Sequence, residues 1–471
     1  MFATHQHGRV RPAATGAVRW ADGFWAERFR TCRETMLPSM RQALDEPENA
    51  AVLANFAVGA GQRDGQHRGT FWSDGDCYKY VQALAHVFEV TRDEALDREM
   101  DEIIEAIRGA QEPDGYLNTQ IQLTDKERWT NKIHHELYNL GHLLTAGSVH
   151  HRVTGKDTLL DVARRAADYL HELFAPRPPE LAHFGFNPSQ IMGLVDLYRE
   201  TGEPRYLELA GVFVDMRGSR PWPWDLAGLA ALGDAIVGDQ CQDRVPLREE
   251  AQAVGHAVTA TYLWAGAADV CAEAGDETLL AALQRIWENV VTRRMYVTGA
   301  VGPQHHGVST RDDKVHEAFA GDWELPNRTA YNETCANIGN AMWNRRMLEL
   351  TGDAKHADVM ERVLYNSLLS ATDIQGTRFC YTNPLARGPR DLPLLSNDSS
   401  ERWFTWKCYC CPPSVARTLA SLHEWAYGVS DEGLWVHLYG GNRVEAELAT
   451  GSRVVLAQTT EYPWAGEVRL R

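Results

Sequence analysis

The sequence predicts an all-α fold, a closed α/α toroid of helical hairpins, followed by a short β segment. Amphipathic helical segments recur in pairs, short turns of similar chemistry join the members of each pair, and the alternation typical of strands begins only near the C-terminus. We therefore expect a toroidal domain over residues 1–428 and a β segment over residues 429–471.

The paired helices are predicted from their periodicity and from the turns between them. Four turns carry a glycine, at Gly155, Gly202, Gly275 and Gly352, and Thr91-Arg92-Asp93 is a version without glycine. Glycine adopts the left-handed conformation that ends a helix, and an acidic residue after it suits the positive start of the next helix. Six such hairpins fit a closed ring whose loops gather at one rim, where function usually lies. About twelve helices are expected, starting near residues 24, 76, 93, 135, 157, 188, 204, 255, 277, 331, 354 and 412.

Three alternating runs follow Gly428, at residues 433–439, 442–448 and 452–458, and glycine and asparagine turns separate them. Their β-branched and aromatic residues are typical of strands. So few strands do not make an independent sheet. We expect them either to pack on the toroid or to begin a β-sandwich that this chain does not finish.

Composition and charge limit the classes of function. The chain has 471 residues and a formal net charge of −17. Nucleic-acid binding needs concentrated Lys and Arg, so this partner is not expected. No apolar run approaches the roughly 18 residues that span a bilayer, which argues against a membrane protein. Residues 1–12 lack the apolar stretch of a secretory signal, so the cytoplasm is the expected compartment, and a homodimer is an assembly that the sequence leaves open.

The cysteines point to a metal site. There are nine, an odd number, and they cluster late in the chain, which favours thiols or a metal centre over a disulfide scaffold. The densest group is Cys408-Tyr-Cys410-Cys411, directly before Pro412 and Pro413. Adjacent cysteines are poor disulfide partners but can turn both sulfurs toward one ion. The prolines suit the first turn of a helix, whose positive end stabilises a thiolate.

A second group, Glu333-Thr-Cys335, lies at the start of the expected helix from Ala336 to Leu350. Residues two apart do not share a helix face, so both side chains reach one ion only from a loop or a frayed helix start. With Cys410 and Cys411 they supply three soft sulfurs and one carboxylate, a set that matches tetrahedral zinc better than a hard cation. A purely structural zinc knot is the competing interpretation.

Four further residues are candidates for contact with a substrate. His316-Glu317 lies in a long Trp-rich loop, where an acid is usually only solvated, but its closeness to Glu333 makes Glu317 a candidate general acid or base. His135, His256 and Tyr381 stand in motifs with other polar and aromatic residues, although each on its own is more often a packing or loop residue.

Taken together, these motifs resemble glycoside hydrolase family 127, the β-L-arabinofuranosidases, and its near relative family 146. The most specific feature is the pairing of Glu333-Thr-Cys335 with Cys410-Cys411-Pro-Pro, and the resemblance runs from about Gly23 to the end of the chain. Further matching motifs are His135-Glu-Leu-Tyr138, Gly141-His-Leu-Leu144, Asp114-Gly-Tyr-Leu-Asn118, Tyr381-Thr-Asn-Pro-Leu385 and Glu461-Tyr-Pro-Trp-Ala-Gly466.

The resemblance implies an (α/α)6 barrel followed by β-sandwich domains, and a retaining exo-hydrolase that acts on a small oligosaccharide or glycoconjugate. It implies Cys410 as nucleophile and Glu317 as acid/base. It also implies sugar contacts from His135, His256 and Tyr381, with His142 as a rival for the role of His135. The implied cofactor is Zn²⁺, held by Glu333, Cys335, Cys410 and Cys411.

One motif departs from the family pattern. The chain reads Gly185-Phe-Asn-Pro-Ser-Gln190 where family members often carry Gly-His-Pro-Glu, so we expect one sugar contact to differ. Three alternatives stay open. They are a hydrolase of another furanoside or rare plant-cell-wall sugar, an (α/α)6 epimerase or unsaturated-uronide hydrolase, which has no use for a thiolate cluster, and a non-catalytic zinc-knotted carbohydrate-binding protein.

Overall fold

The computed structural model describes residues 6–46, 51–184, 186–219, 238–386, 401–404, 408–448 and 450–471. Within this part of the chain, six helices form a closed inner ring, because each packs on the next and the last packs back on the first. This arrangement confirms the predicted toroid. The inner helices are α4 (Ser73–Thr91), α7 (Glu136–Thr154), α9 (Ser189–Thr201), α12 (Ala257–Ala274), α14 (Thr334–Thr351) and α16 (Cys411–Trp425).

An outer layer of helices covers this ring. α1 (Gly23–Thr31) continues through a π-helical turn, Cys32–Met36, into α2 (Leu37–Asp45). Each of the others follows its inner partner after a short turn and buries one apolar face against the ring, which gives the closed hairpins of the prediction. They are α5 (Glu94–Ala110), α8 (Thr158–Phe174), α10 (Pro204–Met216), α13 (Glu277–Asn289) and α15 (Ala354–Val363).

The expected helix starts are confirmed, and the largest differences are residue 76 against Ser73 and residue 331 against Thr334. The short helices α3 (Val52–Gly59) and α6 (Thr119–Gln122) were not predicted. The turn chemistry also holds. The residues that end α7, α9, α12 and α14 are the four glycines, with φ between +68° and +75°, and Arg92 takes the same conformation at φ +53°. Asp93, Asp276 and Asp353 then accept hydrogen bonds from the first backbone amides of the next helix.

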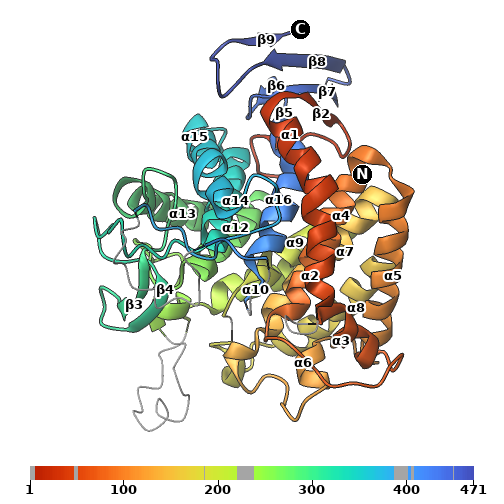
Figure 1. Ribbon diagram of the computed structural model, residues 1–471. Coiled ribbons are helices and arrows are strands. Elements are labelled where there is room, and N and C mark those ends of the chain that lie inside the picture. The colour runs from red at the N-terminus through yellow and green to blue at the C-terminus, as the bar shows by residue number, and fades with distance from the viewer. Residues whose placement is uncertain are drawn as a thin grey trace.

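The C-terminal strands pair with the N-terminus of the chain. β1 (Arg11–Pro12) extends β5 (Tyr427–Ser430) and β6 (Gly433–Val436) in the order β1-β5-β6. The second sheet has the order β2-β7-β8-β9, with β2 antiparallel to β7. Both sheets lie at one end of the helical ring (Figure 1). The division proposed at 428/429 falls inside β5. The strands of the second sheet are β2 (Val18–Asp22), β7 (Gly441–Glu447), β8 (Arg453–Thr460) and β9 (Val468–Leu470).

One large hydrophobic core fills the space between the inner and outer helices, with Trp25, Trp264 and Trp343 among its fully buried side chains. Lys79 is among the charged residues that are fully buried in the interior. Such a charge needs partners, because an isolated buried ion is strongly destabilising. Across the described residues, no helix is both long and apolar enough to traverse a bilayer.

Candidate active site

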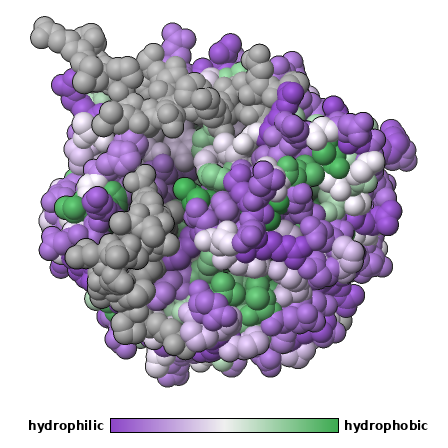
Figure 2. Space-filling model, turned by 90° about the horizontal axis from the view of Figure 1, so that it is seen from below, coloured by the Kyte–Doolittle hydropathy of each residue, from purple (hydrophilic) through white to green (hydrophobic). Residues whose placement is uncertain are grey.

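The first turns of the inner helices gather at the rim opposite the two sheets. Lys79 of α4 donates to the Tyr138 hydroxyl of α7 at 2.8 Å and to the Cys410 carbonyl before α16 at 2.9 Å. Ser189, the first residue of α9, donates to the Tyr138 carbonyl at 2.8 Å. The inner helices therefore run parallel, with their positive ends at this rim. The described surface on this side is mostly hydrophilic, with hydrophobic residues in small groups (Figure 2).

The four predicted ligands come together here. Glu333 is the N-cap of α14 and Cys335 lies in its first turn, while Cys410 is the N-cap of α16 and Cys411 its first residue. Each pair therefore reaches a common point from a helix start, as the spacing required. Pro412 and Pro413 occupy the first turn, as predicted. All four ligand residues are buried.

The spacing of the four ligand atoms fits a metal ion. The three Cys335, Cys410 and Cys411 sulfurs are 3.5–3.8 Å apart. Glu333 Oε1 lies 3.7 Å from the Cys410 sulfur and 3.9 Å from the Cys411 sulfur. Zinc–sulfur bonds of about 2.3 Å in a tetrahedron place sulfurs about 3.8 Å apart. This Glu/Cys/Cys/Cys cluster can therefore hold a metal ion.

The thiols need a cation to become anionic. Burial raises the pKa of the Cys411 thiol well above its usual value. A hydrogen bond from Cys335 lowers the pKa of Cys410, but the bond to Cys408 and burial raise it to about 12. Protonated thiols are poor nucleophiles, so a bound cation would be the group that makes this cluster reactive.

Two neighbours of the cluster were not assigned a role from the sequence. Lys79 pairs with Asp76 at 2.9 Å and is completely buried beside the thiols. The Cys408 sulfur lies 3.6 Å from that of Cys410. A Lys three residues after an Asp inside an otherwise buried helix is a signal that could have been noticed, because buried charges are rare without a purpose.

Glu317 lies on a strand, which corrects the expectation that it belongs to a loop. β3 (Gln304–Val308) and β4 (Lys314–Ala318) form an antiparallel hairpin, and Glu317 has a left-handed backbone at φ +52°. The hairpin was missed because each strand is only five residues long and the pattern of charges hides their alternation.

The Glu317 carboxylate is held by two donors. His256 Nε2 donates to one oxygen at 2.9 Å and the Tyr331 hydroxyl to the other at 2.8 Å. His256 is the N-cap of α12, and its Nδ1 accepts from the Thr259 amide at 3.3 Å, so the proton of the neutral ring is on Nε2. Burial raises the pKa of Glu317, but the hydrogen bonds from His256 and Tyr331 outweigh it and lower the pKa to about 2.

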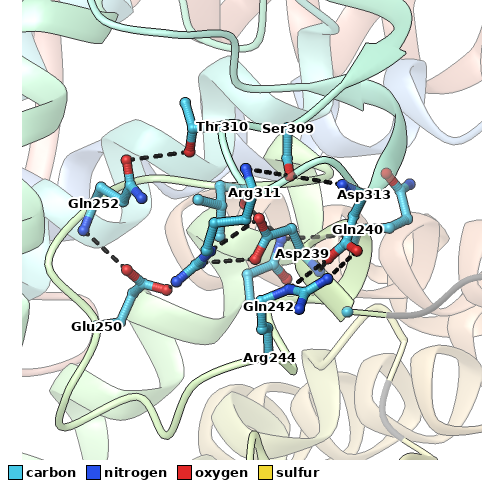
Figure 3. A network of polar contacts seen from close by, with 12 residues as sticks. Asp239, Gln240, Gln242, Arg244, Glu250, Gln252, Ser309, Thr310, Arg311 and Asp313 are labelled. Atoms are coloured by element: carbon cyan, nitrogen blue, oxygen red, sulfur yellow. Dashed lines mark hydrogen bonds and ion pairs between the residues drawn. The ribbon is translucent and has the colours of Figure 1, made fainter. Parts of the chain in front are cut away.

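A polar network anchors this hairpin to the segment before α12 (Figure 3). Arg311 pairs with Asp239 at 2.7 Å and with Glu250 at 2.6 Å. The Gln240 side chain accepts from the His316 amide at 2.9 Å and donates to the His316 carbonyl at 3.2 Å. The network fixes the backbone next to Glu317, so it positions the carboxylate without touching it.

The predicted sugar contacts surround Glu317. The Phe186 ring lies 5.4 Å from the His135 ring and 5.5 Å from the His256 ring, edge-on to both, so it stands between them. The Tyr381 ring lies 5.9 Å from that of Tyr331, whose hydroxyl donates to Glu317. Phe186 belongs to the motif from Gly185 to Gln190 that departs from the family pattern, and Gly185 itself lies outside the described residues.

His142, the rival of His135, lies deeper in the ring. Its Nδ1 is 3.3 Å from Arg417, and it lines a cavity on the far side of the lumen. Arg417 also donates to the Tyr262 hydroxyl at 3.0 Å, so it spans the lumen from α16 to α7 and α12. The structure therefore places His135, and not His142, beside Glu317 and His256.

Comparisons with known proteins agree with this arrangement. Residues 17–424 match the family model described as "Beta-L-arabinofuranosidase, GH127 catalytic domain". The non-reducing end beta-L-arabinofuranosidase of Bifidobacterium longum subsp. longum is 35% identical over 448 residues, which cover 92% of this chain and 66% of that protein. The chain thus spans just under two thirds of that relative's length.

Solved structures give the same result. A GH127 beta-L-arabinofuranosidase from Geobacillus stearothermophilus T6 is 38% identical with a TM-score of 0.87, over 96% of this chain and 72% of that one. A cellobiose 2-epimerase from Bacillus thermoamylovorans B4167, at 11% identity and a TM-score of 0.50 over 85% of this chain and 99% of that one, shares the fold alone. Both relatives have the helical barrel, but only the first is close enough to bear on family.

Proposed function

The chain belongs to glycoside hydrolase family 127, and from that membership we propose that it is a retaining exo-hydrolase releasing terminal β-L-arabinofuranose. Its substrate would be a small oligosaccharide or glycoconjugate. The observation that carries the proposal is the buried array of three sulfurs and one carboxylate next to a glutamate with two hydrogen-bond donors. A thiol cluster of this kind has no use in an epimerase.

We propose Zn²⁺ as the cofactor, because three sulfurs and one carboxylate at tetrahedral spacing suit this soft-to-borderline ion. A zinc ion held by Glu333, Cys335, Cys410 and Cys411 would keep the Cys410 sulfur anionic at neutral pH. Lys79, buried close by, offsets part of the negative charge of the cluster. The remaining negative charge suits the positive charge that develops on the sugar ring in the transition state.

The reaction then proceeds in two steps. The Cys410 sulfur attacks the anomeric carbon and forms a C–S bond, the bond to the leaving oxygen breaks, and Glu317 protonates that oxygen. Glu317 next takes a proton from water, the water oxygen attacks the same carbon, and the sulfur leaves as the anion. Two inversions give net retention. The first step requires the pKa of Glu317 to rise when sugar displaces water around it, since desolvation favours the neutral acid.

His135, His256 and Tyr381 are proposed to contact the sugar, because they lie around Glu317. Phe186 presents an apolar ring between the two histidines, and it belongs to the motif that departs from the family's Gly-His-Pro-Glu pattern. This change favours a second candidate, a hydrolase of another furanoside with the same mechanism. We also propose the cytoplasm as its compartment, since a cluster of thiols such as Cys408, Cys410 and Cys411 stays reduced there.

Hydrolysis of an aryl β-L-arabinofuranoside, followed by NMR during the first minutes, tests the proposal. We expect β-L-arabinose as the first product, before mutarotation. A matched set of aryl furanosides of other sugars tests the second candidate, which predicts faster turnover of one of them. An α product, isomerised sugar or no turnover of any furanoside contradicts the proposed mechanism.

A further inference from the structure

At the opposite end of the ring, α4 and α16 bring together two histidines and two glutamates. His86 and Glu89 come from α4, and His423 and Glu424 come from α16. His86, Glu89 and His423 are at most 2% exposed, and the Glu424 side chain is 13% exposed. His86 Nδ1 lies 3.4 Å from Glu424 Oε1 and 3.7 Å from Glu89 Oε2. The cluster joins the first and last helices of the inner ring.

Three of these atoms face one another without a hydrogen bond. His86 Nδ1, Glu89 Oε2 and Glu424 Oε1 are inaccessible to solvent and make no hydrogen bond of ordinary geometry among the described residues. Apart from one another, their charged neighbours are His423 Nε2, 3.2 Å from Glu89 Oε2, and Arg152, 3.8 Å from Glu424 Oε1. Most buried polar groups are hydrogen-bonded, so three converging exceptions need an explanation. The other oxygen of Glu89 accepts from the Gly16 amide, which fixes the direction of the carboxylate.

We propose that His86, Glu89 and Glu424 bind a divalent cation of the zinc or manganese class, independently of the thiol cluster. Their ligand atoms all lie within 4.8 Å of one another. A tetrahedral ion with bonds of about 2.1 Å needs ligand atoms about 3.4 Å apart, and the two distances from His86 Nδ1, 3.4 Å and 3.7 Å, are close to this value. One imidazole and two carboxylates, without sulfur, suit a harder ion than the thiol cluster does. Two carboxylates neutralise its charge.

The surroundings suit such an ion. His86 and Glu424 line a cavity of about 620 Å³ in the lumen, which gives the ion a path to the cluster. His423 Nε2 lies 3.2 Å from Glu89 Oε2 and would support that ligand from outside. The bound ion would link α4 to α16 and so stabilise the closure of the ring.

A metal-free alternative competes with this site. In that alternative, His86 carries its proton on Nδ1 and shares it between the two glutamates. The Gln82 side-chain nitrogen lies 3.4 Å from His86 Nε2, whereas a metal on Nδ1 leaves a proton on Nε2 that needs an acceptor. Metal binding therefore requires the Gln82 amide to turn, at the cost of its 3.2 Å hydrogen bond from Arg417. The two states differ in metal content, which can be measured.

The test is the zinc content of the purified full chain after saturation and desalting. We expect two equivalents in the parent, and one each in Glu424→Gln and Cys411→Ser. Asp196→Asn is the matched control, because Asp196 lines the same cavity but bonds to Thr145, and it should keep two. One equivalent in the parent that Cys411→Ser removes and Glu424→Gln does not would overturn the site. A single equivalent in the parent that Glu424→Gln removes and Cys411→Ser does not would support the site at His86, Glu89 and Glu424, and it would refute metal binding by the thiol cluster.

A measurement on the parent alone covers the case in which a variant does not fold. Co²⁺ added to the metal-free chain should bind twice, with the intense sulfur charge-transfer absorption accounting for only one of the two equivalents. The other should show only weak visible bands typical of nitrogen and oxygen ligands. Saturation at a single equivalent, all of it with sulfur absorption, would overturn the proposal.

Discussion

The two ends of the inner helical ring are built from the same six helices but carry different chemistry. At the first-turn end, sulfurs and a carboxylate sit on helix starts, where the partial positive charge favours anions. At the other end, arginines form ion pairs with carboxylates. Asp269, for example, pairs with Arg199 at 2.9 Å and with Arg346 at 2.5 Å. Arg417 spans the lumen between them.

The contrast follows from the direction of the inner helices, which all begin at one end of the ring and finish at the other. Parallel inner helices give one rim a positive field from every helix start, so an anionic nucleophile and a carboxylate are stabilised there. Helix ends favour cations, and the arginines of the far end occupy that position. Substitutions at the rim that holds the helix starts should therefore change activity. Substitutions of buried charged residues at either end of the ring should change the free energy of unfolding.

The largest effect is expected at the nucleophile. Cys410→Ser should lower kcat by roughly 10³-fold or more, because the serine hydroxyl lacks an anionic form at neutral pH. Cys408→Ser is the matched control, since its sulfur lies 3.6 Å away but is outside the ligand set, and it should lose far less. Initial rates on an aryl arabinofuranoside, with circular dichroism to verify folding, measure both. Equal losses in the two variants would remove the special role of Cys410.

The acid/base should show its effect through the leaving group. Glu317→Gln should slow substrates with poor leaving groups by roughly 10²–10⁴-fold and activated aryl glycosides much less, because a good leaving group needs no proton. The measurement is a plot of log kcat/KM against leaving-group pKa. A slope as shallow as that of the parent would assign the proton transfer to another residue.

The buried lysine links the active rim to stability. Lys79→Met leaves Asp76 unpaired in the interior, so the free energy of unfolding should fall by roughly 3–5 kcal/mol. The double variant Asp76→Leu with Lys79→Met should recover most of that loss. Urea unfolding of the three proteins compares them. If the double variant is as unstable as the single one, charge is not the reason for the loss.

A smaller effect is expected from pH near the far end of α7. Burial lowers the pKa of His150 to about 4, from a usual value of about 6.5. His150 therefore contributes stability above pH 6.5 that is lost as the pH falls through 4, on the order of 2 kcal/mol by pH 5. His150→Leu should flatten the decline of the urea midpoint between pH 7 and pH 5. An unchanged decline would place the effect on other groups.

The helices, and the placement of Glu333, Cys335, Cys410 and Cys411 at helix starts, were predictable because their signals are local. Periodic segments, capping glycines such as Gly275 and the prolines after Cys411 each act within one turn of chain. The strands β1 and β2 were not, since they are short and their partners lie more than 400 residues away. The Lys79–Asp76 pair and the two donors on Glu317 depend on side chains meeting in space, which sequence spacing does not fix.

The most direct test of the central claim is mass spectrometry of the full chain after brief reaction with a slow arabinofuranosyl substrate. We expect one pentosyl adduct, located on the peptide that contains Cys410, and none in Cys410→Ser. An adduct on a carboxylate such as Glu317 or Glu333, with Cys410 unmodified, would contradict it.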